Sequence, residues 1–152
     1  MELFSNIDWN IFLRLFVAMI LGVAIGIERT VAHKTAGMRT YGLVSMGAAL
    51  FVIISSVMTQ QYSDTASLDP LRMASQIIVG IGFLGAGLII FRESTLSGLT
   101  TAAGLWVAGG IGTACGFGLY TIAIFATILT LFIFSILWII ENKIKKITDA
   151  NE

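Results

Sequence analysis

Charged residues are scarce in this sequence: Asp, Glu, Lys and Arg together make up 12% of its 152 residues. Soluble domains carry about 25% charged residues, so the composition excludes an ordinary soluble domain. The formal net charge is zero, which argues against a nucleic-acid partner. Apolar residues, in contrast, account for 57% of the chain. We therefore predict an integral membrane protein whose first partner is the lipid bilayer.

Cysteine and histidine each occur once. Cys115 lies inside a hydrophobic segment, so the chain cannot form an intramolecular disulfide or a cysteine-based zinc site. His33 lies in a basic loop, where a solvated side chain is the simplest interpretation. No pairing of a nucleophile with a base is visible, so we expect no enzyme activity and no cofactor. The first ten residues lack the basic region of a signal peptide, and we expect the first apolar segment to stay in the membrane.

The apolar residues fall into five segments, each long enough to cross most of the ~30 Å hydrocarbon layer. These segments are residues 11–27, 41–58, 73–91, 99–117 and 119–140. Asp69 and Pro70 predict a capped start for the third segment. The fourth and fifth segments are separated only by a tight turn at Gly116, Phe117 and Gly118. The sequence thus predicts one all-α domain, a five-helix transmembrane bundle followed by a short basic tail over residues 141–152.

The basic residues indicate the orientation of this bundle. With five spans, seven of them fall on one side: Arg29, Lys34, Arg39, Arg92, Lys143, Lys145 and Lys146. Only Arg14 and Arg72 fall on the other. The positive-inside rule then places the N-terminus outside and the C-terminus in the cytoplasm. Tyr41 and Trp138 are expected in an aromatic belt at the inner surface.

Small residues recur at helical spacing in the first, third and fourth segments. Such residues let helix backbones approach closely in lipid. The candidates for helix packing are Gly22, Gly26, Gly82, Gly85, Gly87, Gly104, Ala108, Gly112 and Gly116. The rows on the first and fourth segments exceed what one thin bundle must bury, so we predict a homodimer or small homo-oligomer. The fifth segment has no glycine and is expected to be more exposed to lipid than the other four.

A set of polar residues forms the candidate functional cluster: Glu28, Arg29, Arg39, Thr40, Gln76, Arg92, Thr100 and Thr101. Side chains of adjacent helical residues diverge, so Glu28 is expected to pair with Lys34, Arg39 or Arg92 rather than with Arg29. An interfacial ion pair that fixes the first hairpin is slightly favoured over a charge cluster at the inner mouth of a pore or docking site. Gln76 needs a hydrogen bond, which we expect from a neighbouring helix.

No acidic residue lies at mid-membrane, which argues against a proton relay or a caged cation site within one subunit. A ring of Glu28 side chains in an oligomer could still form an entrance for a divalent cation. The sequence identifies no metal site.

Four blocks of the sequence resemble the MgtC/SapB family of bacterial inner-membrane proteins. They are residues 22–29 (GVAIGIER), 34–51 (KTAGMRTYGLVSMGAALF), 72–90 (RMASQIIVGIGFLGAGLII) and 98–106 (GLTTAAGLW). The motif residues of the family map onto Gly26, Glu28, Arg29, Gly37, Arg39, Thr40, Gln76, Gly82, Gly85, Gly87, Gly98, Thr100 and Thr101.

The resemblance implies a five-span domain in the inner membrane and a role in adaptation to low magnesium, acid or the host phagosome. It also implies association with virulence and with modulation of other membrane machines, including ATP synthase. Family members with the full architecture carry a soluble C-terminal domain, whereas 12 residues follow Ile140 here. We expect a short member with the membrane domain only. Its leading function is then modulation of magnesium and energy homeostasis through contacts with other membrane proteins, and the alternative is a cation channel or transporter.

Overall fold

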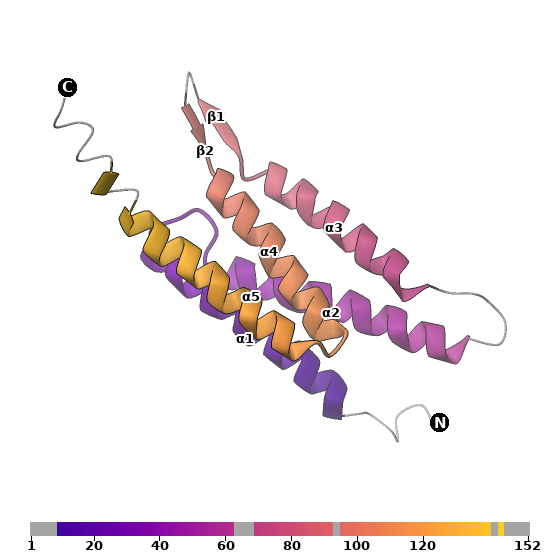
Figure 1. The fold of residues 1–152 in the computed structure, drawn as a ribbon. Helices are drawn as coiled ribbons and strands as arrows, with labels where there is room; N and C mark the ends of the chain where they lie inside the picture. Colours follow the sequence, from indigo (N-terminus) through magenta and orange to yellow (C-terminus); the bar gives the residue numbers. More distant parts are fainter. Residues whose placement is uncertain (1–8, 63–68, 93–94, 141–142, 145–152) are drawn as a thin grey trace.

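The computed structural model describes residues 9–62, 69–92, 95–140 and 143–144. Five helices dominate it: α1 (Trp9–Val31), α2 (Met38–Gln61), α3 (Pro70–Ala86), α4 (Leu99–Gly116) and α5 (Tyr120–Phe132). A π-helical turn, η2 (Ile133–Leu137), continues α5. Successive helices run in opposite directions, and α1 begins at the opposite end of the bundle from η2 (Figure 1). The predicted five-helix bundle is therefore present.

Helix α4 lies at the centre of the bundle and packs against each of the other four helices. Its small residues make this possible, because Gly104, Ala108 and Gly112 are all buried. Helices α1 and α2 pack closely on each other behind α4, while α3 and α5 flank it on opposite sides (Figure 1). Helix α3 is as peripheral as α5. The expectation that the fifth segment is more exposed than the third is therefore wrong.

Within the described ranges, three helices are long and apolar enough to cross a membrane by length and composition: Trp9–Val31, Met38–Gln61 and Tyr120–Ile140, the last of which includes α5 and η2. Helix α3 has 17 residues and α4 has 18, so both are shorter than these three. At about 1.5 Å per residue, each extends roughly 26 Å. The bundle thus combines three long helices with a shorter pair, α3 and α4.

The segment after α3 differs from its prediction. The helix ends at Ala86 rather than near residue 91, and a two-stranded antiparallel hairpin follows: β1 (Ile90–Arg92) and β2 (Thr95–Ser97). Phe91 pairs with Leu96 across it. Gly85 and Gly87 weaken the helix, and branched and aromatic residues favour a strand directly after them. The chain is accordingly mostly helical rather than all-α.

Local chemistry sets the helix boundaries. The Asp69 carboxylate accepts a hydrogen bond from the Leu71 amide at 2.9 Å, which confirms the predicted cap of α3. The Met38 amide at the start of α2 donates to Thr30 Oγ1 at 3.1 Å, so a side chain from α1 caps the next helix. At the turn before α5, Gly118 has a φ of 78°, a left-handed conformation that favours glycine. The predicted tight turn is therefore confirmed.

Arg14 caps the end of α4. Its Nη1 donates to the Gly116 carbonyl oxygen at 3.0 Å. The last carbonyls of a helix have no partner within the helix and carry partial negative charge. A guanidinium at this place satisfies one carbonyl and balances that charge, and it ties α1 to the α4–α5 turn.

A buried charge cluster at the end of α1

Among the residues that the structure describes, Arg29 is the only charged residue that is buried, with 3% of its surface exposed. It lies in the last turn of α1, where a cation is favoured by the helix dipole. Its Nε donates to Oε2 of Glu28 in a salt bridge. The expectation that adjacent residues diverge, leaving Glu28 to pair elsewhere, is therefore wrong. Both side chains are long enough to bend over the same helix end, and the Arg29 guanidinium is held inside the bundle.

The ring of Phe134 holds the guanidinium from the other side. Arg29 Cζ lies 3.6 Å from the centroid of that ring, which is the geometry of a cation–π contact. Phe134 is 6% exposed and belongs to the π-helical turn η2. Single π-helical turns change which residues of a helix face its neighbours, and they recur at functional sites. The cluster thus joins the end of α1 to the end of the α5 segment.

Tyr41 completes the cluster from α2. Its side chain is fully buried, and its hydroxyl donates to the Thr101 carbonyl oxygen in the first turn of α4 at 3.1 Å. Gly104 leaves room for this arrangement, because a Cβ there would lie 2.6 Å from the Tyr41 hydroxyl and 2.5 Å from the Phe134 ring. Tyr41 is therefore a core residue and not part of an aromatic belt at the surface. Four elements, α1, α2, α4 and η2, meet at this point.

The other members of the predicted polar cluster are dispersed. Arg39, Thr40 and Thr100 are exposed. Gln76 lies in the second turn of α3, toward the opposite end of the bundle, and is also exposed. The side chain of Arg92 lies outside the part of the chain that the structure describes. Among the predicted members whose side chains are described, Glu28 and Arg29 pair directly, and Thr101 joins the cluster through its carbonyl oxygen. Tyr41 and Phe134 were not predicted from the sequence as members of the cluster.

The small residues of α1 and α4 allow close packing between helices of the same chain. A Cβ at Gly22 would meet the Tyr41 carbonyl oxygen at 2.5 Å, and one at Gly26 would collide with Met38. A Cβ at Gly112 would collide with the Ser45 backbone, and one at Gly116 would lie 2.9 Å from the Ala49 carbonyl oxygen. These rows therefore serve α1–α2 and α2–α4 packing. Their number is no argument for an oligomer.

The glycines of α3 behave differently. A Cβ at Gly85 would make ordinary contact with Ala102 on α4, at 3.5 Å or more, and one at Gly87 would meet only the preceding turn of its own chain. A Cβ at Gly82 would meet nothing within 4 Å. Gly82, expected at a helix interface, faces open space in this chain.

Chemically, the cluster is a neutralised and packed charge pair. Of the two charged side chains, that of Glu28 is the more accessible, with 20% of it exposed against 4% for Arg29. Within the described residues, no group of three or more His, Cys, Asp or Glu side chains is placed to hold a metal ion. The geometry is suited to locking four helix ends together.

Comparison with known proteins now identifies the family. The chain matches the MgtC family over residues 15–143. It belongs to the MgtC family. Escherichia coli (strain K12) has a relative named "Putative magnesium transporter YhiD", which is 42% identical over 129 residues and is matched over 82% of this chain and 59% of its own length. No solved structure is significantly similar to the chain.

Other relatives show the same pattern of coverage. Protein MgtC of Brucella abortus (strain 2308) is 46% identical over 111 residues, which cover 73% of this chain and 44% of that protein. An uncharacterized protein of Haemophilus influenzae is 40% identical over 133 residues, covering 85% and 56% respectively. The chain therefore spans about half the length of the curated relatives it matches. It is a membrane protein of the MgtC family, and the Arg29 cluster lies within the matched region.

Proposed function

We propose that this chain crosses the bacterial inner membrane five times, with its N-terminus outside and its C-terminus in the cytoplasm. The alternating directions of the five helices support this topology (Figure 1). The basic residues support it too, because Arg29 lies at the end of α1, Arg39 at the start of α2, Lys34 between them and Lys143 after the α5 segment. The shorter helices α3 and α4 then cross as a pair, with the β1–β2 hairpin on the cytoplasmic side.

We further propose that the protein acts without enzymatic chemistry, as a modulator of magnesium and energy homeostasis that supports stress or virulence adaptation. It acts by contact with other membrane proteins. Family membership and the name of the Escherichia coli relative support the link to magnesium. Because the chain matches only about half of its relatives' length, the proposal concerns the matched region.

One observation carries the modulator proposal: Glu28, the candidate acid for cation entry, is already neutralised. Its carboxylate accepts from Arg29, and Arg29 is sealed on the other side by Phe134. A divalent cation approaching Glu28 would meet the positive charge of Arg29 and would have to break the salt bridge. The charges therefore serve packing better than they serve an ion path.

The alternative is a magnesium channel or transporter formed by an oligomer. The name of the Escherichia coli relative favours it. So does the position of Glu28, which keeps part of its side chain exposed at the proposed cytoplasmic end. In this alternative, several copies of Glu28 would surround a shared entrance.

Magnesium flux into proteoliposomes separates the two functions. Vesicles loaded with a magnesium-sensitive dye would hold the wild type, Glu28→Gln or no protein. Lys34→Gln, which removes an exposed charge at the same end, is the control. The modulator proposal predicts no flux above that of empty vesicles from protein shown to be helical by circular dichroism. Saturable flux that falls in Glu28→Gln but persists in Lys34→Gln would establish transport instead.

A further inference from the structure

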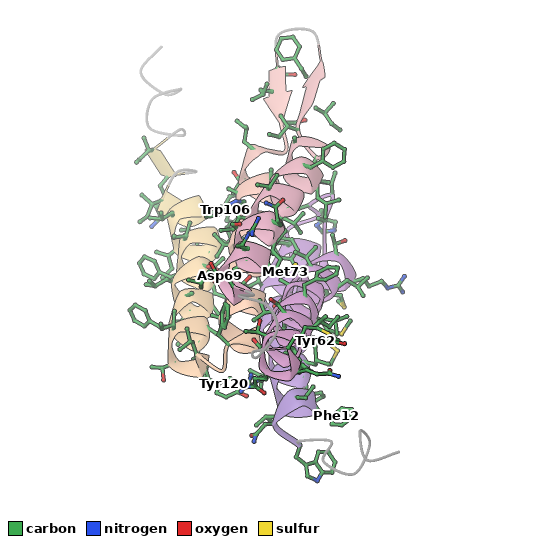
Figure 2. All side chains as sticks on the ribbon, turned by 90° about the vertical axis from the view of Figure 1, so that its right-hand side faces the viewer. Phe12, Tyr62, Asp69, Met73, Trp106 and Tyr120 are labelled. Atoms are coloured by element: carbon green, nitrogen blue, oxygen red, sulfur yellow. The ribbon has the colours of Figure 1, made fainter. Side chains whose placement is uncertain are left out.

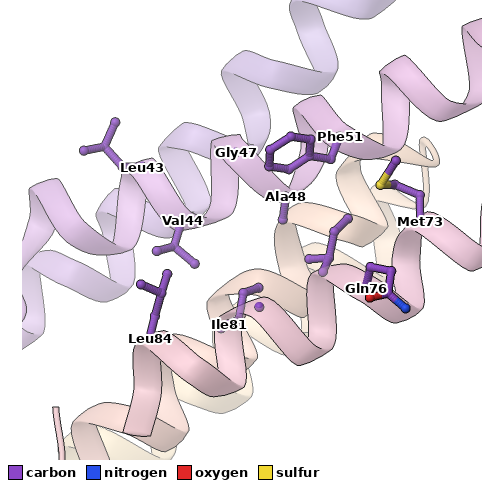
Figure 3. A pocket seen from close by; sticks show the side chains of 11 residues that line it. Leu43, Val44, Gly47, Ala48, Phe51, Met73, Gln76, Ile81 and Leu84 are labelled. Atoms are coloured by element: carbon purple, nitrogen blue, oxygen red, sulfur yellow. The ribbon is translucent and has the colours of Figure 1, made fainter. Parts of the chain in front are cut away.

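A groove of about 510 Å³ runs between α2 and α3 on the outside of the bundle. Gly47 and Phe51 line it from α2, and Met73, Gln76 and Gly80 line it from α3 (Figure 3). Its walls are apolar apart from the amide of Gln76. The groove extends along about three turns of α3, from Met73 to Leu84.

The two glycines that line this groove, Gly47 and Gly80, do not mediate close packing between helices of the same chain. A Cβ at Gly47 or at Gly80 would meet nothing within 4 Å, unlike one at Gly22 or Gly112. Glycine inside a helix costs roughly 1 kcal/mol relative to alanine. Two open glycines on facing walls leave space for a backbone to approach from outside, which is how small residues function between helices in membranes.

Gln76 supplies a specific attraction in the same groove. It is exposed, and it makes no hydrogen bond with any residue that the structure describes. It lies roughly 9 Å along the helix axis from the start of α3. Lipid tails offer no partner to an amide at such a depth, so an unpaired amide there is costly. The described part of the chain provides no such partner, so a partner from another molecule fits this position.

We propose that a second copy of this chain fills the groove, with α3 of each copy packed into the α2–α3 groove of the other. A two-fold axis brings a residue opposite its own copy. The Gln76 amide carries N–H donors and a carbonyl acceptor. Two such amides facing each other can therefore each donate an N–H to the carbonyl oxygen of the other. A lipid tail would fill the space but would leave the amide unpaired. This inference rests on the proposed five-span topology, which places Gln76 within the hydrocarbon layer, but it is the same whether the protein modulates partners or transports ions.

Disulfide cross-linking in membranes tests the contact directly. In a Cys115→Ala background, Gly80→Cys places a thiol in the groove. Gly82→Cys is the matched control, because Gly82 is equally open but two residues away, on roughly the opposite side of α3. We expect a covalent dimer from Gly80→Cys and little from Gly82→Cys. Equal cross-linking of the two variants, or none from Gly80→Cys, would overturn the proposal.

Leucine variants measure the contribution of each feature to dimerisation in liposomes. Gly80→Leu fills the groove and should weaken the dimer about tenfold or more, an overpacking effect. Gln76→Leu should weaken it about threefold, the effect of one hydrogen bond in a membrane. Gly82→Leu should match the wild type. A wild-type protein that is monomeric, with or without bound lipid in native mass spectrometry, would refute a second copy as the occupant.

Discussion

The guanidinium of Arg29 lies 3.6 Å from the centroid of the Phe134 ring, although the two residues are far apart in the sequence. One belongs to the first helix and the other to the π-helical turn that continues the last one. Their contact closes the bundle at the end where Tyr41 and Thr101 also meet.

Replacing the Phe134 ring should lower the free energy of unfolding more than replacing the Phe132 ring. Phe134→Leu keeps an apolar side chain but removes the cation–π contact, which is worth about 2 kcal/mol when desolvated. We expect the free energy of unfolding in mixed detergent micelles to fall by about that amount. Phe132→Leu is the control, because Phe132 is 49% exposed on the same helical segment. Equal losses from both variants would contradict the role assigned to Phe134.

The glycines of α4 should divide into two classes. Gly112→Ala forces a Cβ into the Ser45 backbone, and overpacking of this kind costs about 1–3 kcal/mol. Gly110→Ala, two residues away, meets nothing within 4 Å and should be neutral or slightly stabilising. Thermal unfolding in detergent distinguishes the two. Tolerance of Gly112→Ala would contradict the α2–α4 packing described above.

Thiol labelling at position 95, in the β1–β2 hairpin, tests whether α3 and α4 cross the membrane. In a Cys115→Ala background, Thr95→Cys should react with a membrane-impermeant thiol reagent only after the cells are permeabilised, because the hairpin is cytoplasmic in the five-span topology. Lys34→Cys should behave in the same way, whereas Gln61→Cys should react in intact spheroplasts. Labelling of Thr95→Cys from outside would mean that α3 and α4 re-enter the membrane without crossing it.

Arg14 should hold the turn between α4 and α5. Arg14→Leu removes the hydrogen bond to the Gly116 carbonyl and leaves that helix end unbalanced, at an expected cost of about 1–2 kcal/mol. Arg14→Lys keeps the charge and should recover part of the loss. Arg72→Leu, which changes an exposed cation on α3, serves as the control in the same unfolding assay. No loss in Arg14→Leu would show that this cap contributes nothing.

Local sequence features predicted much of the fold. Hydropathy located the five helices, Asp69 and Pro70 marked the start of α3, and Gly118 marked the last turn, because each of these depends on neighbouring residues. The hairpin at 90–97 was missed because Ile90 and Phe91 are equally apolar in a helix or a strand. Hydropathy alone therefore could not place the end of α3.

The functional cluster was less accessible from sequence. Glu28 and Arg29 stood out as rare charges in an apolar chain, but their pairing depends on the direction in which the side chains bend. Phe134 was one of ten phenylalanines, and nothing local distinguished it. Tyr41 resembled an interfacial aromatic residue because it follows a basic loop. These contacts depend on tertiary packing between distant segments.

Sequence periodicity did not separate lipid-facing from buried residues. In Figure 2, Trp106 lies on the face between α3 and α5, even though it belongs to the central helix α4. It is 52% exposed, while Leu105 beside it is 2% exposed. Both surfaces of a membrane helix are apolar, so periodicity carries little information about which one is buried.

The most direct test of the central claim removes both charges of the Arg29 cluster together. If Glu28 and Arg29 serve packing, the double variant Glu28→Gln/Arg29→Met should fold at least as well as either single variant, since removing both charges together leaves neither of them unpaired. It should also restore growth in low magnesium to cells that lack the protein. Failure of this double variant to restore growth, when it is folded and present at wild-type levels in the membrane, would show that the charges themselves perform the function.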